Sequence, residues 1–326
     1  WLIRSGDQLP KKDKRTFKTS ESIKAGSSGS INLKIWEGEI EDPVTDNRFI
    51  GMLKVSGSDF DDGVIPAGAD LECDYEVLDS GNIVLEVSIP SIGGVFHSGH
   101  NFYSRQDGQV DFSNAAARVA EDTESTMERL DEVSDVVDDP KLEQARKKLS
   151  RASELDPDDP DTERAQESME NILEAKRLLA QVRKEHLKEI RQLDLDHAKQ
   201  FFDGHIREHA RPSEETSFDN LVRTAQREID RNGKGFENHL DELRGKNFEI
   251  LWRQDWFVVE KFKNMAQSPY NFSDQNRFKE LVAAGLELLQ ADEIDKLRGV
   301  VGQLGMMQIG SVSETQMLDI ANIVRG

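Results

Sequence analysis

The 326-residue sequence has a single cysteine, Cys73, few aromatic residues, and no apolar run long enough to cross a bilayer. One cysteine excludes an internal disulfide framework and suits a reducing compartment, so we expect a cytoplasmic protein. A membrane-spanning helix needs ~20 apolar residues, so we expect no membrane segment. Trp1 is soon followed by the charged Arg4 and Asp7, so we expect no signal peptide, and the missing initiator Met suggests a fragment of a longer protein.

Positive charge is outnumbered by negative charge in this chain. Lys and Arg number 42 against 63 Asp and Glu, which gives a net charge of −21. Such an acidic chain repels phosphate groups, which argues against nucleic acids and anionic membranes as partners. A P-loop is missing as well, because residues 26–30 lack the Gly-Lys-Ser/Thr ending. The length exceeds what one hydrophobic core usually serves, so we expect two or more domains.

Apolar residues alternate with polar ones through the first part of the chain. The clearest runs are Ile31, Leu33 and Ile35, then Leu71, Cys73, Tyr75 and Val77, then Ile83, Leu85, Val87 and Ile89. A period of two with one apolar face predicts half-buried antiparallel strands. Residues 79–82 predict a hairpin turn, and a short strand is expected at Thr16–Thr19. We therefore predict an antiparallel β-sandwich over residues 1–98.

Beyond residue 98 the apolar period changes from 2 to 3.6, which indicates helices and an α+β fold class. Residues 99–212 are expected to hold a connector and several helices. One of these is predicted to run unbroken from residue 162 to about 202, a stretch without Gly or Pro that would span roughly 60 Å. Residues 213–326 are expected to form a C-terminal helical bundle, whose last helix opens with a capping box from Ser313 to Gln316.

Several short stretches of the predicted sandwich carry a family resemblance. They are Leu9-Pro10-Lys11-Lys12, Thr16-Phe17-Lys18-Thr19, the strand from Ser30 to Glu39 that closes in Gly-Glu, Arg48-Phe49-Ile50-Gly51, and Asp79 to Val87. In this order and spacing they resemble the substrate-binding β-sandwich of the 70-kDa heat-shock chaperones. The resemblance implies a chaperone fragment that captures unfolded or extended hydrophobic polypeptide, with co-chaperones as further partners.

The resemblance also implies where a peptide would lie. In that family the backbone of an extended peptide is held by hydrogen bonds, while one aliphatic side chain enters a pocket. Burying one leucine contributes roughly 1.5–3 kcal/mol, so the backbone contacts must supply the rest. The first helices, at about residues 110–155, would take the place of the family's lid. Carried over by position, the peptide-binding residues are Phe17, Ile31, Leu33, Leu71 and Cys73 in the pocket and Ser20 in the arch over the peptide.

The chain departs from the family pattern in three ways. The loop between Ser20 and Ile31 is longer than the family's loop. The family's strand before Leu2 is absent, which would leave a sheet edge open to self-association. The nucleotide-binding domain is absent too, so ATP would belong to a domain outside this chain, and we expect neither a cofactor nor enzyme activity here.

Other interpretations of the same residues stay open. The pocket residues also fit the ordinary core of any β-sandwich, and the chain could then be a helical scaffold or adaptor whose sandwich is structural only. Trp252 and Trp256 fit either a helical core or a partner-binding face. We expect no metal site, because His205 and His209 lie four residues apart but lack the Glu that a zinc protease motif places beside its first His.

Overall fold

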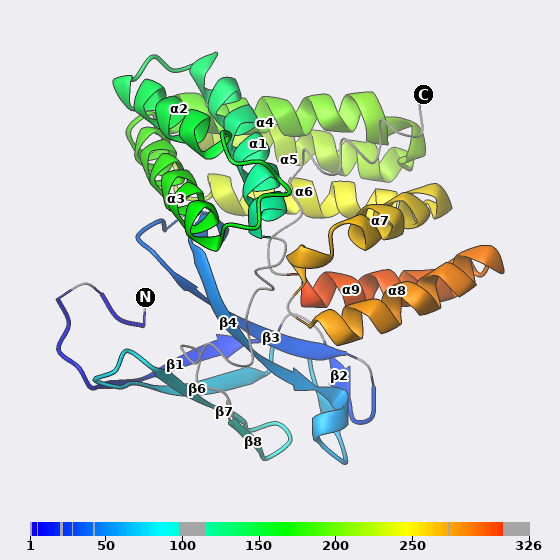
Figure 1. The fold of residues 1–326 in the computed structure, drawn as a ribbon. Coiled ribbons are helices and arrows are strands. Elements are labelled where there is room, and N and C mark those ends of the chain that lie inside the picture. Colours follow the sequence, from blue (N-terminus) through cyan, green and yellow to red (C-terminus); the bar gives the residue numbers. More distant parts are fainter. Residues whose placement is uncertain are drawn as a thin grey trace.

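The computed structural model describes residues 2–4, 6–19, 22–27, 29–41, 43–97, 115–272 and 274–308. Over these residues the predicted α+β class is confirmed, with antiparallel strands at one end of the molecule and helices in the remainder (Figure 1). None of the described helices is both long enough and apolar enough to cross a membrane.

The elements follow one another in chain order. The strands are β1 (Lys11–Lys18), β2 (Ile23–Lys24), β3 (Ser30–Glu37), β4 (Arg48–Ser56), β5 (Val64–Ile65), β6 (Asp70–Val77), β7 (Ile83–Ile89) and β8 (Gly94–His97). The main helices are α1 (Ala115–Ser134), α2 (Pro140–Ala152), α3 (Thr162–Glu185), α4 (Leu187–Phe201), α5 (Pro212–Asp230), α6 (Phe236–Trp252), α7 (Asp255–Gln267), α8 (Gln275–Gln290) and α9 (Ile294–Met307). Short helical turns include η1 (Val44–Asp46) and a π-helical turn, η4 (Phe202–Ile206).

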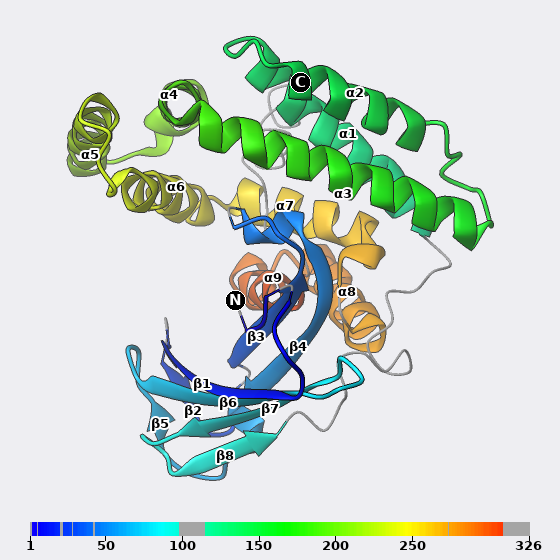
Figure 2. The ribbon, with the colours of Figure 1, turned by 90° about the vertical axis from the view of Figure 1, so that its left-hand side faces the viewer.

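The strands form two layers, which we call the sandwich. One layer is an antiparallel sheet in the order β1-β6-β7-β8, and the hairpin β3–β4 packs over its inner face (Figure 2). The alternation predicted for β6 is confirmed, since Leu71, Cys73 and Tyr75 are buried while Glu72 and Asp74 between them are not. The apolar faces of the two layers therefore enclose one core.

Strand β1 is longer than the sequence predicted. The expected strand covered only Thr16–Thr19, whereas β1 begins at Lys11 and pairs with β6 along its whole length. Cross-strand ion pairs join Lys12 to Glu76 at 2.9 Å and Lys18 to Asp70 at 2.8 Å. Opposite charges that face each other across a sheet stabilise the pairing, so this strand forms without apolar alternation.

The prediction of one unbroken helix from residue 162 to about 202 is wrong. The segment forms α3 and α4, which point in different directions (Figure 2). His186 between them leaves the helical conformation, with φ −112° and ψ 44°, and its Nε2 lies 3.2 Å from Oδ2 of Asp139 at the start of α2. The break allows α3 to pack on α1 and α2 while α4 packs on α5 and α6.

Buried apolar side chains group the described elements around four cores. One fills the sandwich, and the others join α1 with α2 and α3, α4 with α5 and α6, and α7 with α8 and α9. The domain limits predicted at residues 98 and 212 stay predictions, because packing alone does not show which parts fold independently. The helix predicted from Ser313 lies outside the described residues.

Candidate functional site

Four of the predicted pocket residues meet at the core of the sandwich. Leu71 and Cys73 point inward from β6 and are 2% and 3% exposed. Ile31 and Leu33 come from β3 and lie partly buried against the same core. Burial raises the pKa of the Cys73 thiol, so this group stays protonated and unreactive at neutral pH. The fold therefore unites two buried side chains and two that lie nearer the surface.

Phe17 lies at the rim of this core. Its partner across the β1–β6 pair is Leu71, and residues that face each other in an antiparallel sheet project to the same side. Unlike Leu71, Phe17 is 44% exposed. Ser20, the residue predicted for the arch, lies outside the described residues. An exposed aromatic ring beside a buried leucine offers an apolar contact to a ligand at this end of the sheet.

The outer edge of β1 has no other strand beside it within the described parts of the chain. β1 stands first in the sheet and pairs with β6 alone. Every second residue of this eight-residue strand turns its backbone N–H and C=O away from β6, so these groups can pair with an added strand. The edge is rich in lysine, which discourages uncontrolled pairing between copies. Self-association through this edge stays a prediction.

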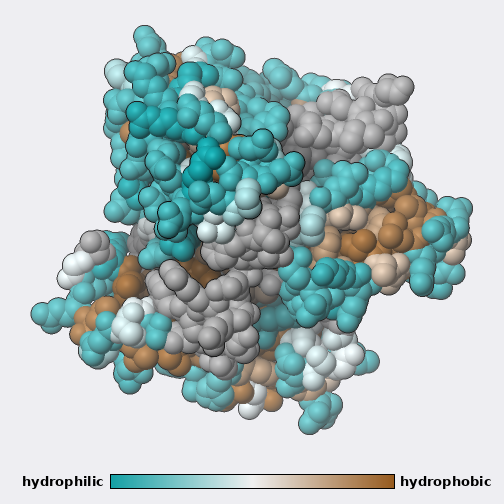
Figure 3. All heavy atoms as spheres, in the orientation of Figure 1, coloured by the Kyte–Doolittle hydropathy of each residue, from teal (hydrophilic) through white to brown (hydrophobic). Residues whose placement is uncertain are grey.

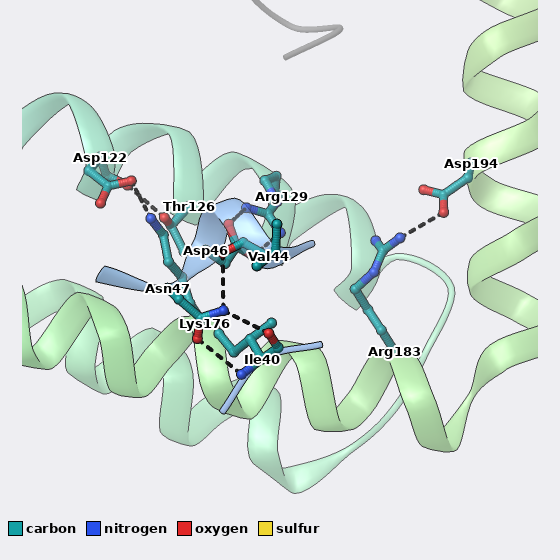
Figure 4. Close-up of polar contacts among 10 residues, drawn as sticks. All are labelled: Ile40, Val44, Asp46, Asn47, Asp122, Thr126, Arg129, Lys176, Arg183 and Asp194. Carbon is teal, nitrogen blue, oxygen red and sulfur yellow. Dashed lines mark hydrogen bonds and ion pairs between the residues drawn. The ribbon is translucent and has the colours of Figure 1, made fainter. Parts of the chain in front are cut away.

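The far end of the hairpin β3–β4 is fixed to α1 by an ion pair (Figure 4). Arg129 of α1 donates from Nη1 and Nη2 to the two carboxylate oxygens of Asp46 in η1, at 2.8 and 2.7 Å. Burial by itself would raise the pKa of Asp46, but hydrogen bonds and charge from Arg129 outweigh it and bring that pKa below its ordinary value. Asp46 is therefore ionised at neutral pH, and the two-pronged contact fixes the hairpin's orientation against α1.

Asn47 closes the loop that presents Asp46. Its amide nitrogen donates to the carbonyl oxygen of Ile40 at 2.7 Å, and its amide oxygen accepts from the Ile40 N–H at 3.0 Å (Figure 4). Gly38 faces this amide, and a Cβ at residue 38 would collide with Oδ1 of Asn47. The Gly-Glu ending of the strand thus has a steric reason, because glycine leaves room for the amide that closes the loop.

Two further ion pairs brace the helices around Arg129 (Figure 4). Lys176 of α3 is buried and donates to Asp122 of α1 at 2.6 Å. Arg183 near the end of α3 donates to Asp194 of α4 at 2.7 Å. These pairs hold α1 on α3 and fix the bend between α3 and α4.

The other face of β3 contacts the end of α9. Asn32 Nδ2 donates to the carbonyl oxygen of Met306 at 2.9 Å, and Lys34 Nζ donates to the carbonyl oxygen of Gln308. Side chains alternate along a strand, so Asn32 and Lys34 face the helix while Ile31 and Leu33 face the core of the sandwich. The hairpin is therefore held by α1 at its far end and by α9 along its outer face.

One group of side chains has the residue types of a metal site. Asp139, Glu185 and His186 each offer a ligand atom, and these atoms lie within 4.8 Å of one another. The ammonium of Lys141 lies 2.6 Å from the carboxylate of Glu185 and 3.5 Å from that of Asp139. A cation of the chain itself already balances these carboxylates, so the group acts as an ion-pair network that joins α2 to the α3–α4 break.

Trp252 and Trp256 are partly buried and pack against the helical cores. Trp252 stacks on Phe248, with ring centroids 5.4 Å apart. The ring of His209 lies 5.7 Å from that of Trp256, whereas His205 belongs to the π-helical turn η4. The two histidines thus do not share one face of a regular helix, which the i, i+4 spacing had suggested. The tryptophans have a structural role that leaves part of each ring on the surface.

Sequence reasoning missed the pair between Asp46 and Arg129. The residues are 83 positions apart, and nothing local links them. The available signal was the Asp46-Asn47 pair in a polar loop, since these residue types favour turns and hydrogen-bonded loop closure. The sequence did not indicate which cation of α1 would reach the loop.

No protein-family model matches the chain, and no curated protein matches it either. The resemblance of the sandwich to a chaperone domain is thus carried by its own residues alone.

Proposed function

We propose that the chain is the peptide-binding part of a molecular chaperone and holds extended hydrophobic segments of unfolded proteins on its sandwich. The observation that carries this proposal is the open edge of β1, an eight-residue strand whose outward-facing backbone groups can pair with an added strand beside the exposed ring of Phe17. Ile31 and Leu33 lie partly buried against the core that contains Leu71, the cross-strand neighbour of Phe17.

This geometry explains how the sandwich would recognise both the backbone and the aliphatic side chains of a peptide. A peptide that pairs with β1 gains backbone hydrogen bonds whatever its sequence, each contributing about 0.5–1.5 kcal/mol. Every second side chain of the peptide projects to the side of the sheet that carries Phe17. One leucine buried there adds about 1.5–3 kcal/mol. The binding is therefore tolerant of sequence but favours aliphatic residues.

The helices are proposed to gate the site. The hairpin that carries Ile31 and Leu33 is tied to α1 by Asp46 and Arg129, so a movement of α1 would move the hairpin over the sheet. In the resembled chaperones an ATP-hydrolysing domain sets such a gate with the help of co-chaperones. We propose the same for the protein to which this chain belongs, while the chain itself needs no catalysis and no cofactor for its part.

The test is fluorescence anisotropy of a labelled, leucine-rich extended peptide titrated with the parent chain and with Phe17→Asp. We expect saturable binding by the parent and a loss of roughly tenfold or more in the variant, because the apolar contact at the rim is removed. Ile31→Asp should also lose binding. Circular dichroism would check that each variant keeps its fold.

Val84→Asp is the matched control for this experiment. Val84 is also 44% exposed but lies on the outer face of β7. Its variant should bind the peptide as the parent does. Unchanged affinity in a folded Phe17→Asp variant, or an equal loss in Val84→Asp, would contradict the proposed site.

A second candidate function is a helical scaffold or adaptor whose sandwich is structural only. It is favoured by an apolar patch between α7 and the far ends of α8 and α9 (Figure 3), and Leu286 of α8 is 48% exposed. Under this candidate the leucine-rich peptide would produce no anisotropy change with the parent chain.

We place the protein in the cytoplasm. The support is Cys73, the single cysteine, which is a buried free thiol and needs no oxidising compartment. Fractionation of cells that express the full-length protein would test this assignment.

A further inference from the structure

The helices α2 and α3 have a hydrophilic surface (Figure 3), and a hollow of about 400 Å³ lies between them. Its lining includes Lys147, Lys148 and Arg151 from α2 and Arg177 from α3, against the single carboxylate of Glu174. The chain as a whole carries a net charge of −21. With Glu143 and Glu39 beside Lys147 and Arg177, the four cations face three carboxylates, so the hollow carries a small excess of positive charge on an acidic chain, which favours anions at this place.

Carboxylates of the chain already show which ligand chemistry suits these cations. Lys148 pairs with Glu174, Lys147 lies 3.7 Å from Glu143, and Arg177 lies 3.5 Å from Glu39. All of these side chains are partly or largely exposed, so a ligand can compete for them at little cost. No ion pair joins Arg151 to any of the described residues, so its guanidinium is available to a ligand.

The spacing of the cations favours an extended peptide over a single compact anion. Lys147 and Arg151 are one helical turn apart, about 6 Å along α2. In an extended peptide, side chains at alternating positions are about 6.6 Å apart, so two acidic residues can reach both cations. Arg177 offers a third contact from α3. Leu178, which is partly buried at the hollow, adds an apolar surface for the methylene groups of the ligand.

The hairpin of the sandwich provides an internal example of this pattern. Its chain runs Glu37-Gly-Glu39-Ile-Glu41, with acidic residues at alternating positions, and the middle one reaches Arg177. We propose that the hollow between α2 and α3 binds an extended acidic peptide of a partner protein, with carboxylates at alternating positions. This site is separate from the sandwich edge and takes a ligand of opposite character, acidic instead of apolar.

The test is anisotropy of a short labelled peptide of alternating glutamate and threonine, with its glutamine analogue as the uncharged comparison. We expect the parent chain to bind the glutamate peptide saturably, added salt to weaken this binding, and the glutamine peptide not to bind. The double variant Lys147→Glu/Arg151→Glu should lose about tenfold or more in affinity. Lys147→Gln/Arg151→Gln should lose less affinity for the glutamate peptide. This milder variant shows the effect even if charge reversal disturbs the fold.

The matched control is Arg223→Glu/Lys279→Glu, which changes the net charge by the same amount on exposed faces of α5 and α8. The affinity of this control for the glutamate peptide should fall by less than about twofold, because salt screens long-range repulsion between exposed charges. No binding by the parent, or an equal loss in both charge-reversed variants, would overturn the proposal. Binding of inorganic phosphate in place of the peptide would also overturn it.

Glu39→Gln gives an independent readout with an opposite sign. The variant frees Arg177 from its internal carboxylate, so the glutamate peptide should bind more tightly than it binds the parent chain. Unchanged or weaker binding by Glu39→Gln would show that Glu39 does not compete with the peptide for Arg177, and would contradict the assignment of Arg177 to the site.

Discussion

A lysine in the helical region makes a sharp test of the packing. Lys261 of α7 is 6% exposed and forms no ion pair with the described residues. Its Nζ lies 5.7 Å from the ring centroid of Phe248, which gives the ammonium a weak cation–π contact. Burial lowers the pKa of Lys261 from 10.5 to about 8. We predict that Lys261→Met stabilises the protein at neutral pH.

The magnitude follows from the difference in pKa between the two states. A pKa of about 8 in the folded chain against 10.5 in the unfolded chain corresponds to about 3 kcal/mol, which is the cost of keeping the buried ammonium charged below pH 8. Replacing the lysine removes this cost but also the cation–π contact, which contributes about 0.5–1 kcal/mol. The expected net gain at pH 7 is therefore about 2 kcal/mol.

The sign of the pH dependence is also determined. Between pH 8 and 10.5 the unfolded chain binds more protons at this residue than the folded chain, so the parent gains stability as the pH rises through that window. The advantage of Lys261→Met should shrink over the same range and vanish near its upper end. Taking the difference between variant and parent cancels the other groups that titrate there.

The assay is urea unfolding of both proteins at pH 7 and near pH 10.5. Tryptophan fluorescence is a suitable probe, because Trp252 and Trp256 lie in the same helical region. A parent at least as stable as Lys261→Met at pH 7, or a difference that does not change with pH, would refute the reasoning.

Two further predictions concern the hairpin and the last helices. Asp46→Asn should lower the free energy of unfolding by about 2 kcal/mol or more, because it leaves the Arg129 guanidinium without its carboxylate. Faster hydrogen exchange in α1 would show this loss. Since the pKa of Asp46 is lowered, the stability that Asp46 contributes to the parent should be lost as the pH falls below about 3.8. An Asp46→Asn variant whose stability depends on acidic pH in the same way as that of the parent would contradict this. Gly285→Ala should destabilise the protein although alanine favours helix, because its Cβ would collide with Phe262, whereas Gly299→Ala meets open space and should stabilise by about 0.5–1 kcal/mol. Thermal unfolding of both glycine variants tests this pair, and a stabilising Gly285→Ala would be the contrary result.

Local patterns predicted the class of the fold and its clearest strands. The alternation of Leu71, Cys73 and Tyr75 required one buried face, and β6 has it. A polar strand such as β1 has no such pattern, because its pairing depends on charges that another strand supplies. The predicted pocket residues Ile31 and Leu33 do reach the same core as Leu71, since a period of two specifies the face of a strand without knowledge of its neighbours.

The sequence by itself determined the change from period 2 to period 3.6 after residue 98, and with it the α+β class. It determined as well that side chains such as Cys73 face inward, because periodicity and burial act over a few neighbouring residues. Only the tertiary structure decided that the long helical stretch breaks at His186, that Asp46 meets Arg129, and that the cations of α2 and α3 line one hollow. These features join residues far apart in the chain, and their energies come from contacts and charges that exist only after the helices have packed.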